Sequence, residues 1–205
     1  YPDDQHVIKN LNLLIKKGEH MAVSGISGSG KSTLLRLLTG AFPTYEGNIS
    51  LNKIPLQNYS IESLRANTGI LLSHQDIFKG TLMENITMGN AALTMEEVTN
   101  MVDRCGLLHF IQSQPEGYNM ILDPAGKRLP KVTIQKILLI RALLGKEKMI
   151  LLEEPTRNLE QANKARVLDF IRSRESMTVL IATNDPEEIA SCNRSIILQP
   201  VKPQD

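Results

Sequence analysis

Several residue types are scarce in this sequence. Tryptophan is absent, aromatic residues make up 4% of the chain, and the only cysteines are Cys105 and Cys192. Two cysteines so far apart in the chain do not make a disulfide framework or a zinc site, which favours a reducing compartment. The net charge of +1 at pH 7 gives no electrostatic reason to expect nucleic acid or an anionic membrane as the main partner.

Long hydrophobic runs are also missing. No apolar run approaches the length that a bilayer-spanning helix needs, and no signal peptide begins the sequence. Any membrane role would therefore depend on a partner or on a segment outside this sequence. Because Tyr1 already lies in what reads as folded structure, we expect an excised domain. The 205 residues, 41% of them hydrophobic, are enough for one large α/β domain with a smaller lobe.

A phosphate-binding motif lies near the N-terminus. Residues 25–33 read Gly-Ile-Ser-Gly-Ser-Gly-Lys-Ser-Thr and have the spacing G-x-x-x-x-G-K-S of a P-loop. Its glycines allow a tight turn whose backbone N–H groups point at the β-phosphate. Lys31 adds a positive charge for the β- and γ-oxygens, and Ser32 offers its hydroxyl to Mg²⁺.

The flanking pattern supports this interpretation over a chance glycine-rich turn. An apolar strand at 20–24 enters the loop and an apolar helix at 32–39 leaves it, which places a triphosphate at the positive end of the helix. We therefore expect the chain to bind a nucleoside triphosphate. The residues expected to bind it are Ser27, Gly28, Ser29, Gly30, Lys31, Ser32 and Thr33.

The rest of the pattern predicts a layered α/β fold. Continuous apolar runs indicate parallel strands buried on both faces, at 20–24, 68–73, 149–152, 178–182 and 195–198. Loose alternation at 7–15 and a hairpin at 47–56, turning near Asn52 and Lys53, predict an antiparallel layer beside the P-loop.

The middle of the chain is predicted to be helical. Thr94 to Glu97 form a capping box, Gly106 ends the helix that it opens, and residues 132–144 read as a largely buried helix. The predicted fold is thus an α/β P-loop NTPase (RecA-like) with a parallel sheet core, an N-terminal antiparallel β layer and a helical subdomain. We expect the core to comprise residues 1–75 and 145–205, and the helical subdomain to comprise residues 76–144.

Two carboxylates, Glu153 and Glu154, directly follow the apolar strand at 149–152. In a P-loop protein the first acid at this place commonly holds Mg²⁺ through water, and a second acid can polarise the attacking water. The alternative is a strand end that carries only solvated charge. The long apolar strand before the pair favours the catalytic interpretation.

These motifs, in this order and at these separations, resemble the ATP-binding domain of ABC transporters over nearly the whole chain, and most closely the exporter subgroup. The resemblance implies that Tyr1 stacks on adenine and that Gln75 reaches Mg²⁺ and the attacking water. It also implies that Glu154 is the catalytic glutamate, whereas Glu153 stands at the metal-binding position normally held by aspartate.

Two other motifs depart from the family's pattern. The signature sequence L-S-G-G-Q falls on residues 129–133, which read Leu-Pro-Lys-Val-Thr. Pro130 has neither a hydroxyl nor an N–H, and Val132 places a branched side chain where a phosphate of the opposite subunit should pass. The switch histidine is replaced by Asn184, which can donate a hydrogen bond to a γ-phosphate oxygen but cannot hold a proton at neutral pH.

The resemblance leaves two functions open. The first is an ATPase motor domain of an exporter-type ABC transporter, with ATP and Mg²⁺ as cofactors and Glu154, Gln75 and Asn184 as catalytic residues. The second is a regulatory or structural ATP-binding module with little hydrolysis; a P-loop kinase would not explain the motif layout. Expected partners are a second ATP-binding domain and a transmembrane domain, at the cytoplasmic face of the plasma (inner) membrane, and no nucleic acid.

Overall fold

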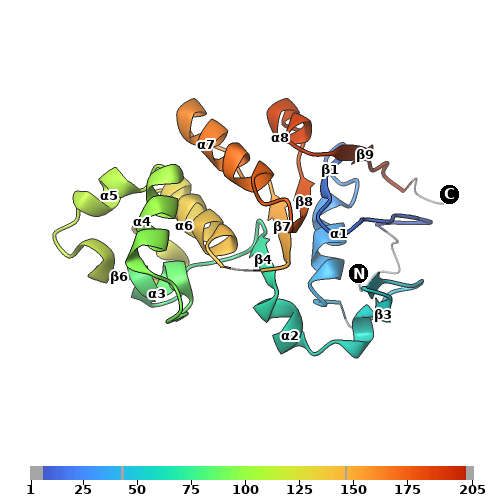
Figure 1. Ribbon diagram of the computed structural model, residues 1–205, viewed down its shortest axis with the longest axis horizontal. Helices are drawn as coiled ribbons and strands as arrows, with labels where there is room; N and C mark the ends of the chain where they lie inside the picture. The colour runs from blue at the N-terminus through green and yellow to red at the C-terminus, as the bar shows by residue number, and fades with distance from the viewer. Residues whose placement is uncertain (1–6, 43, 146, 202–205) are drawn as a thin grey trace. The chain divides into compact units, whose positions relative to one another are not determined.

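The computed structural model describes residues 7–42, 44–145 and 147–201 (Figure 1). The chain divides into two compact units. The first comprises Tyr1–Thr68, Glu147–Glu154 and Glu175–Asp205, and the second comprises Gly69–Lys146 and Pro155–Arg174. The division into a core at 1–75 and 145–205 and a helical subdomain at 76–144 stays a prediction. In the division by contacts, the helix Gln161–Arg172 belongs to the second unit.

The parallel sheet confirms that the predicted apolar runs form strands, but the strand at the 195–198 run lies at the edge of the sheet and is mostly exposed, not buried on both faces as predicted. Its order is β4-β7-β8-β1-β9, and β8 pairs in parallel with β7 and β1, as β1 does with β9. The strands are β1 (His20–Ser24), β4 (Thr68–Leu71), β7 (Met149–Glu153), β8 (Thr178–Ala182) and β9 (Arg194–Ile197). In the central strands Ala22, Leu151 and Ile181 are fully buried, as a sheet covered on both faces requires.

Helix α1 (Lys31–Leu38) directly follows the P-loop and packs on β7 and β8. Its buried side chains are Leu34 and Leu35. It ends where Gly40 adopts a left-handed backbone with φ 73°. The first unit also contains α2 (Ile61–Ala66) and α8 (Pro186–Ala190). The helix predicted after the P-loop is therefore confirmed.

Of the antiparallel layer, the hairpin is confirmed and the strand at 7–15 is wrong. Strands β2 (Ser50–Leu51) and β3 (Ile54–Pro55) pair in antiparallel fashion. Asn52 and Lys53 connect them with φ values of 52° and 67°, which a two-residue type I′ turn needs. Over residues 7–19 the structure assigns no strand. Asn10, at φ 54°, interrupts the extended backbone that the alternation of apolar residues predicted.

The second unit is mainly helical. Its helices are α3 (Leu82–Thr87), α4 (Met95–Arg104), α5 (Leu108–Gln112), α6 (Lys131–Leu143) and α7 (Gln161–Arg172). The sequence did not predict the short antiparallel pair β5 (Gly80–Thr81) and β6 (Ile121–Leu122), because two residues are too few to show an alternating pattern. Helix α6 buries most of its length, including Ile137, Leu139 and Ile140, so the predicted buried helix is confirmed.

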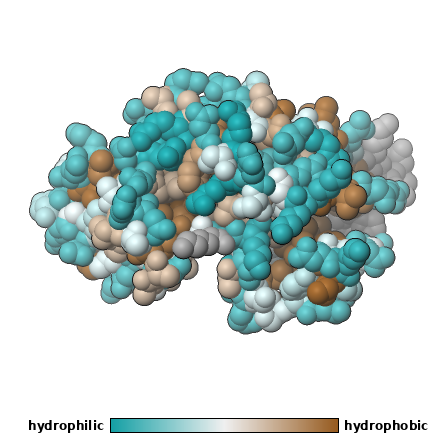
Figure 2. Space-filling view, viewed as in Figure 1, coloured by the Kyte–Doolittle hydropathy of each residue, from teal (hydrophilic) through white to brown (hydrophobic). Residues whose placement is uncertain are grey.

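Among the residues that the structure describes, no helix combines the length and apolar character needed to cross a bilayer. Figure 2 shows mostly hydrophilic residues on the face in view, with hydrophobic residues in small separate groups.

The capping box predicted at the start of α4 is present. Thr94 Oγ1 accepts a hydrogen bond from the Glu97 N–H at 3.2 Å, and Glu97 Oε2 accepts from the Thr94 N–H at 2.8 Å. Thr94→Ala removes the hydroxyl that accepts from the Glu97 N–H and should destabilise the protein by about 1 kcal/mol. Urea unfolding followed by circular dichroism measures this loss. The control is Met95→Ala, which removes an exposed side chain outside the box and should cost less than half as much.

Candidate functional site

The P-loop connects β1 to α1 through three glycines whose backbone conformations L-residues rarely adopt. Gly25, Gly28 and Gly30 have φ values of 147°, 81° and 96°. Within the loop the Ser29 N–H donates to the Ile26 carbonyl at 3.1 Å, which closes a tight turn. Gly30 is the N-cap of α1 and offers no side-chain cap. The N–H groups at the positive end of this helix are therefore available to a ligand bound in the loop.

One buried polar atom in the loop has no partner within the described part of the chain. Ser29 is only 1% exposed, and its Oγ makes no hydrogen bond there. A buried hydroxyl without a partner is costly, so such atoms need an explanation. A phosphate group supplies oxygens that accept from this hydroxyl and from the amides at the start of α1. The residues of the loop therefore fit a bound phosphate.

The Lys31 side chain folds back onto the start of the P-loop. Its Nζ donates to the Gly25 carbonyl at 2.5 Å and to the Ile26 carbonyl at 3.1 Å. The ammonium group thus lies against the turn of the loop. Its acceptors there are carbonyl oxygens, whereas in a nucleotide complex they would be phosphate oxygens. Because these bonds are to neutral acceptors, exchanging them for an ionised phosphate strengthens them.

Two predicted metal-binding residues meet at the end of β7. Ser32, in the first turn of α1, donates its hydroxyl proton to Oε1 of Glu153 at the end of β7. A hydroxyl and a carboxylate oxygen are ligands of the kind that Mg²⁺ prefers. The longer side chain of glutamate at this position therefore still reaches the serine that the family's motif pairs with the metal.

Glu154 follows with a backbone that is unusual for a side-chain-bearing residue. Its φ is 44°, in the left-handed region, and its N–H donates to the Ala182 carbonyl at 3.0 Å. Such conformations store about 1 kcal/mol or more and cluster at functional sites. The left-handed backbone thus lies directly after Glu153, at a residue that still hydrogen-bonds to the end of β8.

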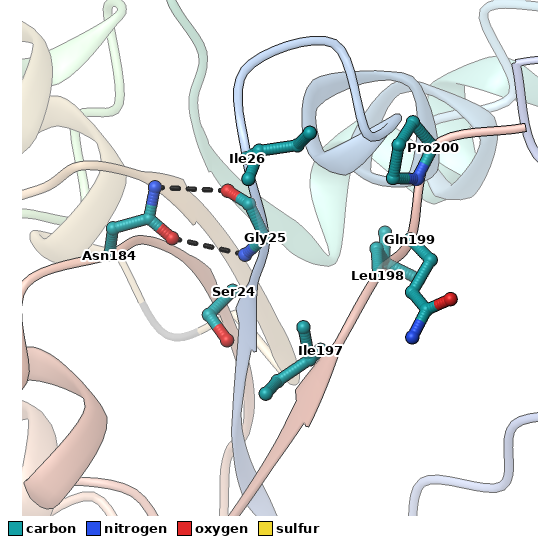
Figure 3. A pocket seen from close by; sticks show the side chains of 8 residues that line it. All are labelled: Ser24, Gly25, Ile26, Asn184, Ile197, Leu198, Gln199 and Pro200. Atoms are coloured by element: carbon teal, nitrogen blue, oxygen red, sulfur yellow. Dashed lines mark hydrogen bonds between the residues drawn. The ribbon is translucent and has the colours of Figure 1, made fainter.

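Asn184 lies after β8, between the ends of β7 and β1 in the sheet order. Its carboxamide pairs with the backbone of Gly25: Oδ1 accepts from the Gly25 N–H at 3.0 Å and Nδ2 donates to the Gly25 carbonyl at 3.0 Å (Figure 3). Both residues border a pocket of about 380 Å³, whose apolar lining includes Ile26, Ile197 and Pro200. No sequence motif joins Asn184 to Gly25, which lie 159 residues apart, so this pairing was not predicted.

The hydrogen bonds around the P-loop do not test the predictions for two other residues, Gln75 and Tyr1. Gln75 belongs to the second unit, where its Oε1 accepts from the Leu72 N–H at 3.1 Å. Tyr1 lies outside the described residues. The roles assigned to both from the family resemblance stay predictions.

The signature segment still begins a helix. Pro130 is the N-cap of α6, with no side-chain cap, and both Pro130 and Lys131 are exposed. The helix therefore tolerates the proline, as expected for a residue that precedes the first turn. The segment offers no hydroxyl where the family has serine, because Pro130 occupies that position.

The cysteines have no part in the chemistry of this site. Both are free, and burial raises the pKa of the Cys105 thiol to about 12 and that of the Cys192 thiol to about 11. Both thiols are therefore protonated at neutral pH and are poor nucleophiles.

Comparison with known proteins places this site in a family. The sequence profile described as "ABC transporter" matches residues 8–157, from just before the P-loop to just after Glu154. This chain belongs to the ABC transporter family. It is an ATP-binding domain of the exporter type, with the α/β fold of these domains.

Individual relatives agree with this assignment. The chain is 32% identical over 94% of its length to a probable ABC transporter ATP-binding/permease protein of Haemophilus influenzae, covering 35% of that protein. It is 28% identical over 97% of its length to the glutathione/L-cysteine transport system ATP-binding/permease protein CydC of Escherichia coli, again covering 35%. This ABC domain thus spans about a third of the length of the curated relatives it matches.

A solved structure shows the same fold. The domain superposes with a TM-score of 0.87 and 26% identity on a bacterial Atm1-family ABC exporter with ATP bound. The match covers 97% of this chain and 35% of that one.

Of the three P-loop glycines, Gly25 has the least space for a side chain. A Cβ at Gly25 would lie 2.4 Å from the Leu198 carbonyl oxygen and 2.6 Å from Ser29 Oγ. We expect Gly25→Ala to destabilise the protein by roughly 2 kcal/mol or more, measured by urea unfolding. The matched control is Gly28→Ala, which has a left-handed φ but nothing within 4 Å of its Cβ, and should cost only about 1 kcal/mol. Equal losses for the two variants would contradict the close packing at Gly25.

Proposed function

We propose that this ABC domain binds MgATP at the P-loop and hydrolyses it slowly, as the motor domain of an exporter-type transporter. The observation that carries the proposal is the buried Ser29 hydroxyl without a partner beside the uncapped start of α1, flanked by Lys31 and by the Ser32–Glu153 pair. Ser27, Gly28, Gly30 and Thr33 complete the loop that would hold the phosphates, and Tyr1 would stack on the adenine.

The metal would be held by Ser32, Glu153 and Gln75 together with phosphate oxygens. When bound, Mg²⁺ neutralises charge on the phosphates. Glu154 would accept a proton at its carboxylate from the attacking water, which Gln75 orients. The left-handed backbone at Glu154, directly after a buried strand, supports this role, since such conformations cluster at functional sites.

Slow turnover is proposed from the signature segment. In this family the segment contacts the γ-phosphate bound by the opposite domain, and Pro130 there has no hydroxyl or N–H to donate. Removing one preorganised donor commonly costs about 10²–10³ in rate. The second candidate function is an ATP-binding module with little hydrolysis. The altered signature segment favours it as well, and the two candidates differ only in how much ATPase activity remains.

The partners are proposed from the relatives. Proteins named as ATP-binding/permease proteins combine both functions in one chain, and this domain spans about 35% of the length of such relatives. We propose a transmembrane domain in the same or another chain, and a second ATP-binding domain that closes on this one as a homodimer or heterodimer. The domain would then lie at the cytoplasmic face of the membrane.

Lys31→Ala tests nucleotide binding. The variant lacks the ammonium group that donates to the Gly25 and Ile26 carbonyls of the loop, so we expect affinity for MgATP to fall by roughly tenfold or more. Isothermal titration of the complete protein measures this change. Lys53→Ala, in the exposed turn between β2 and β3, is the control and should leave affinity unchanged. Unchanged affinity in Lys31→Ala would remove the P-loop assignment.

Restoring the signature tests the cause of slow turnover. We expect Pro130→Ser, Lys131→Gly, Val132→Gly and Thr133→Gln, made together, to raise steady-state ATPase activity by about tenfold or more, because donors return to the γ-phosphate of the opposite site. Lys131→Ala alone is the control and should not raise it. A wild-type protein that already turns over at about 1 s⁻¹ or faster would contradict the proposed defect.

A further inference from the structure

Asn184 is held rigidly from both sides of the chain. On one side, the Thr183 N–H donates to the Val23 carbonyl at 2.9 Å, which extends the pairing of β8 with β1. On the other side, the Asp185 N–H donates to Thr183 Oγ1 at 2.9 Å. Asp185 Oδ1 then accepts from the N–H groups of Glu187 and Glu188 and caps α8. The backbone that carries the Asn184 side chain therefore has little freedom to move.

This rigid connection presents the carboxamide to the entrance of the P-loop. Oδ1 and Nδ2 of Asn184 pair with the N–H and the carbonyl of Gly25, each at 3.0 Å. Only this orientation of the amide satisfies both backbone groups, because the N–H must meet an acceptor and the carbonyl a donor. Figure 3 shows the Asn184 carboxamide facing Gly25. Gln199 lies on the other side of the pocket, and its side chain extends away from Gly25.

The Gly25 carbonyl accepts two hydrogen bonds at once. One comes from Lys31 Nζ at 2.5 Å and the other from Asn184 Nδ2 at 3.0 Å. A carbonyl oxygen has two lone pairs, so both are in use. When Lys31 turns to a phosphate it gives up its bond to this carbonyl, and the bond from Asn184 then keeps the carbonyl satisfied and in place.

We propose that Asn184 is a positioning residue that fixes the start of the P-loop through Gly25, and that it supports the binding of ADP and ATP equally rather than sensing the γ-phosphate. This inference rests on the proposed binding of nucleotide at the P-loop. The carboxamide touches the backbone that precedes the turn, so it acts on the phosphate contacts that both nucleotides share. An imidazole cannot replace it, because its two ring nitrogens point in diverging directions and cannot pair with the N–H and the carbonyl of one residue.

The first test compares two nucleotides. We expect Asn184→Ala in the complete protein to weaken ADP and a non-hydrolysable ATP analogue by the same factor, about five- to tenfold, as measured by isothermal titration with Mg²⁺. Asn184→Asp should weaken both at least as much, because a carboxylate oxygen would face the Gly25 carbonyl. Gln199→Ala removes an amide from the same pocket without touching Gly25, and should change neither affinity.

The second test needs no nucleotide. In the nucleotide-free protein, amide hydrogen exchange at Gly25 should be about tenfold faster in Asn184→Ala than in the wild type, since that N–H loses its acceptor. Exchange at Gly25 in Gln199→Ala should match the wild type. This measurement tests the hold of Asn184 on the loop whether or not the proposed function is right.

Two results would overturn the inference. One is a loss of affinity confined to the ATP analogue with ADP unaffected, which would make Asn184 a γ-phosphate contact. The other is unchanged exchange at Gly25 in Asn184→Ala. A wild-type protein that bound neither nucleotide would instead overturn the proposed function, and the exchange result would still decide whether Asn184 positions the loop.

Discussion

The backbone at Gly25 is the constraint on which the candidate site depends. At this residue the chain leaves β1 and enters the P-loop with φ 147°, and a neighbouring carbonyl and hydroxyl fill the space that a Cβ would need. The same residue receives hydrogen bonds from Lys31 and Asn184. The loop is thus anchored at its first residue, which leaves the following residues to wrap around a phosphate.

The parallel sheet explains why chemically useful residues gather here. Strands β7, β8 and β1 are neighbours, and the carboxyl ends of parallel strands lie at the same edge. Glu153 and Glu154 follow β7, Asn184 follows β8, and Gly25 follows β1. Residues that are more than a hundred positions apart in the chain therefore meet as hydrogen-bonded pairs, such as Ser32 with Glu153.

The domain combines a P-loop that fits a bound phosphate with an altered signature segment. The P-loop has the backbone geometry and the lysine that phosphate binding requires. At the start of α6 a proline replaces the signature serine, yet the helix forms, because a proline before the first turn removes no intrahelical hydrogen bond. The substitution therefore changes what the helix offers to a ligand and leaves its folding intact.

The elements of the fold were predictable where local chemistry decides them. The apolar runs of β1, β7 and β8, the hairpin that turns at Asn52 and Lys53, and the capping box at Thr94 were all confirmed. The strand expected at 7–15 failed, because its weak alternation was overridden by the left-handed backbone at Asn10. The pair β5 and β6 was missed, because a two-residue strand depends on its partner rather than on its own pattern.

The sequence by itself determined the family, the P-loop and the residue types available for chemistry, because motif spacing along the chain records them directly. Only the tertiary structure decided how those residues are used. It showed that Asn184 pairs with the backbone of Gly25, that the Ser29 hydroxyl is buried without a partner among the described residues, and that Glu154 occupies a left-handed turn. These features depend on how strands distant in the chain align at one sheet edge, and no local pattern of residues specifies the hydrogen bonds made there.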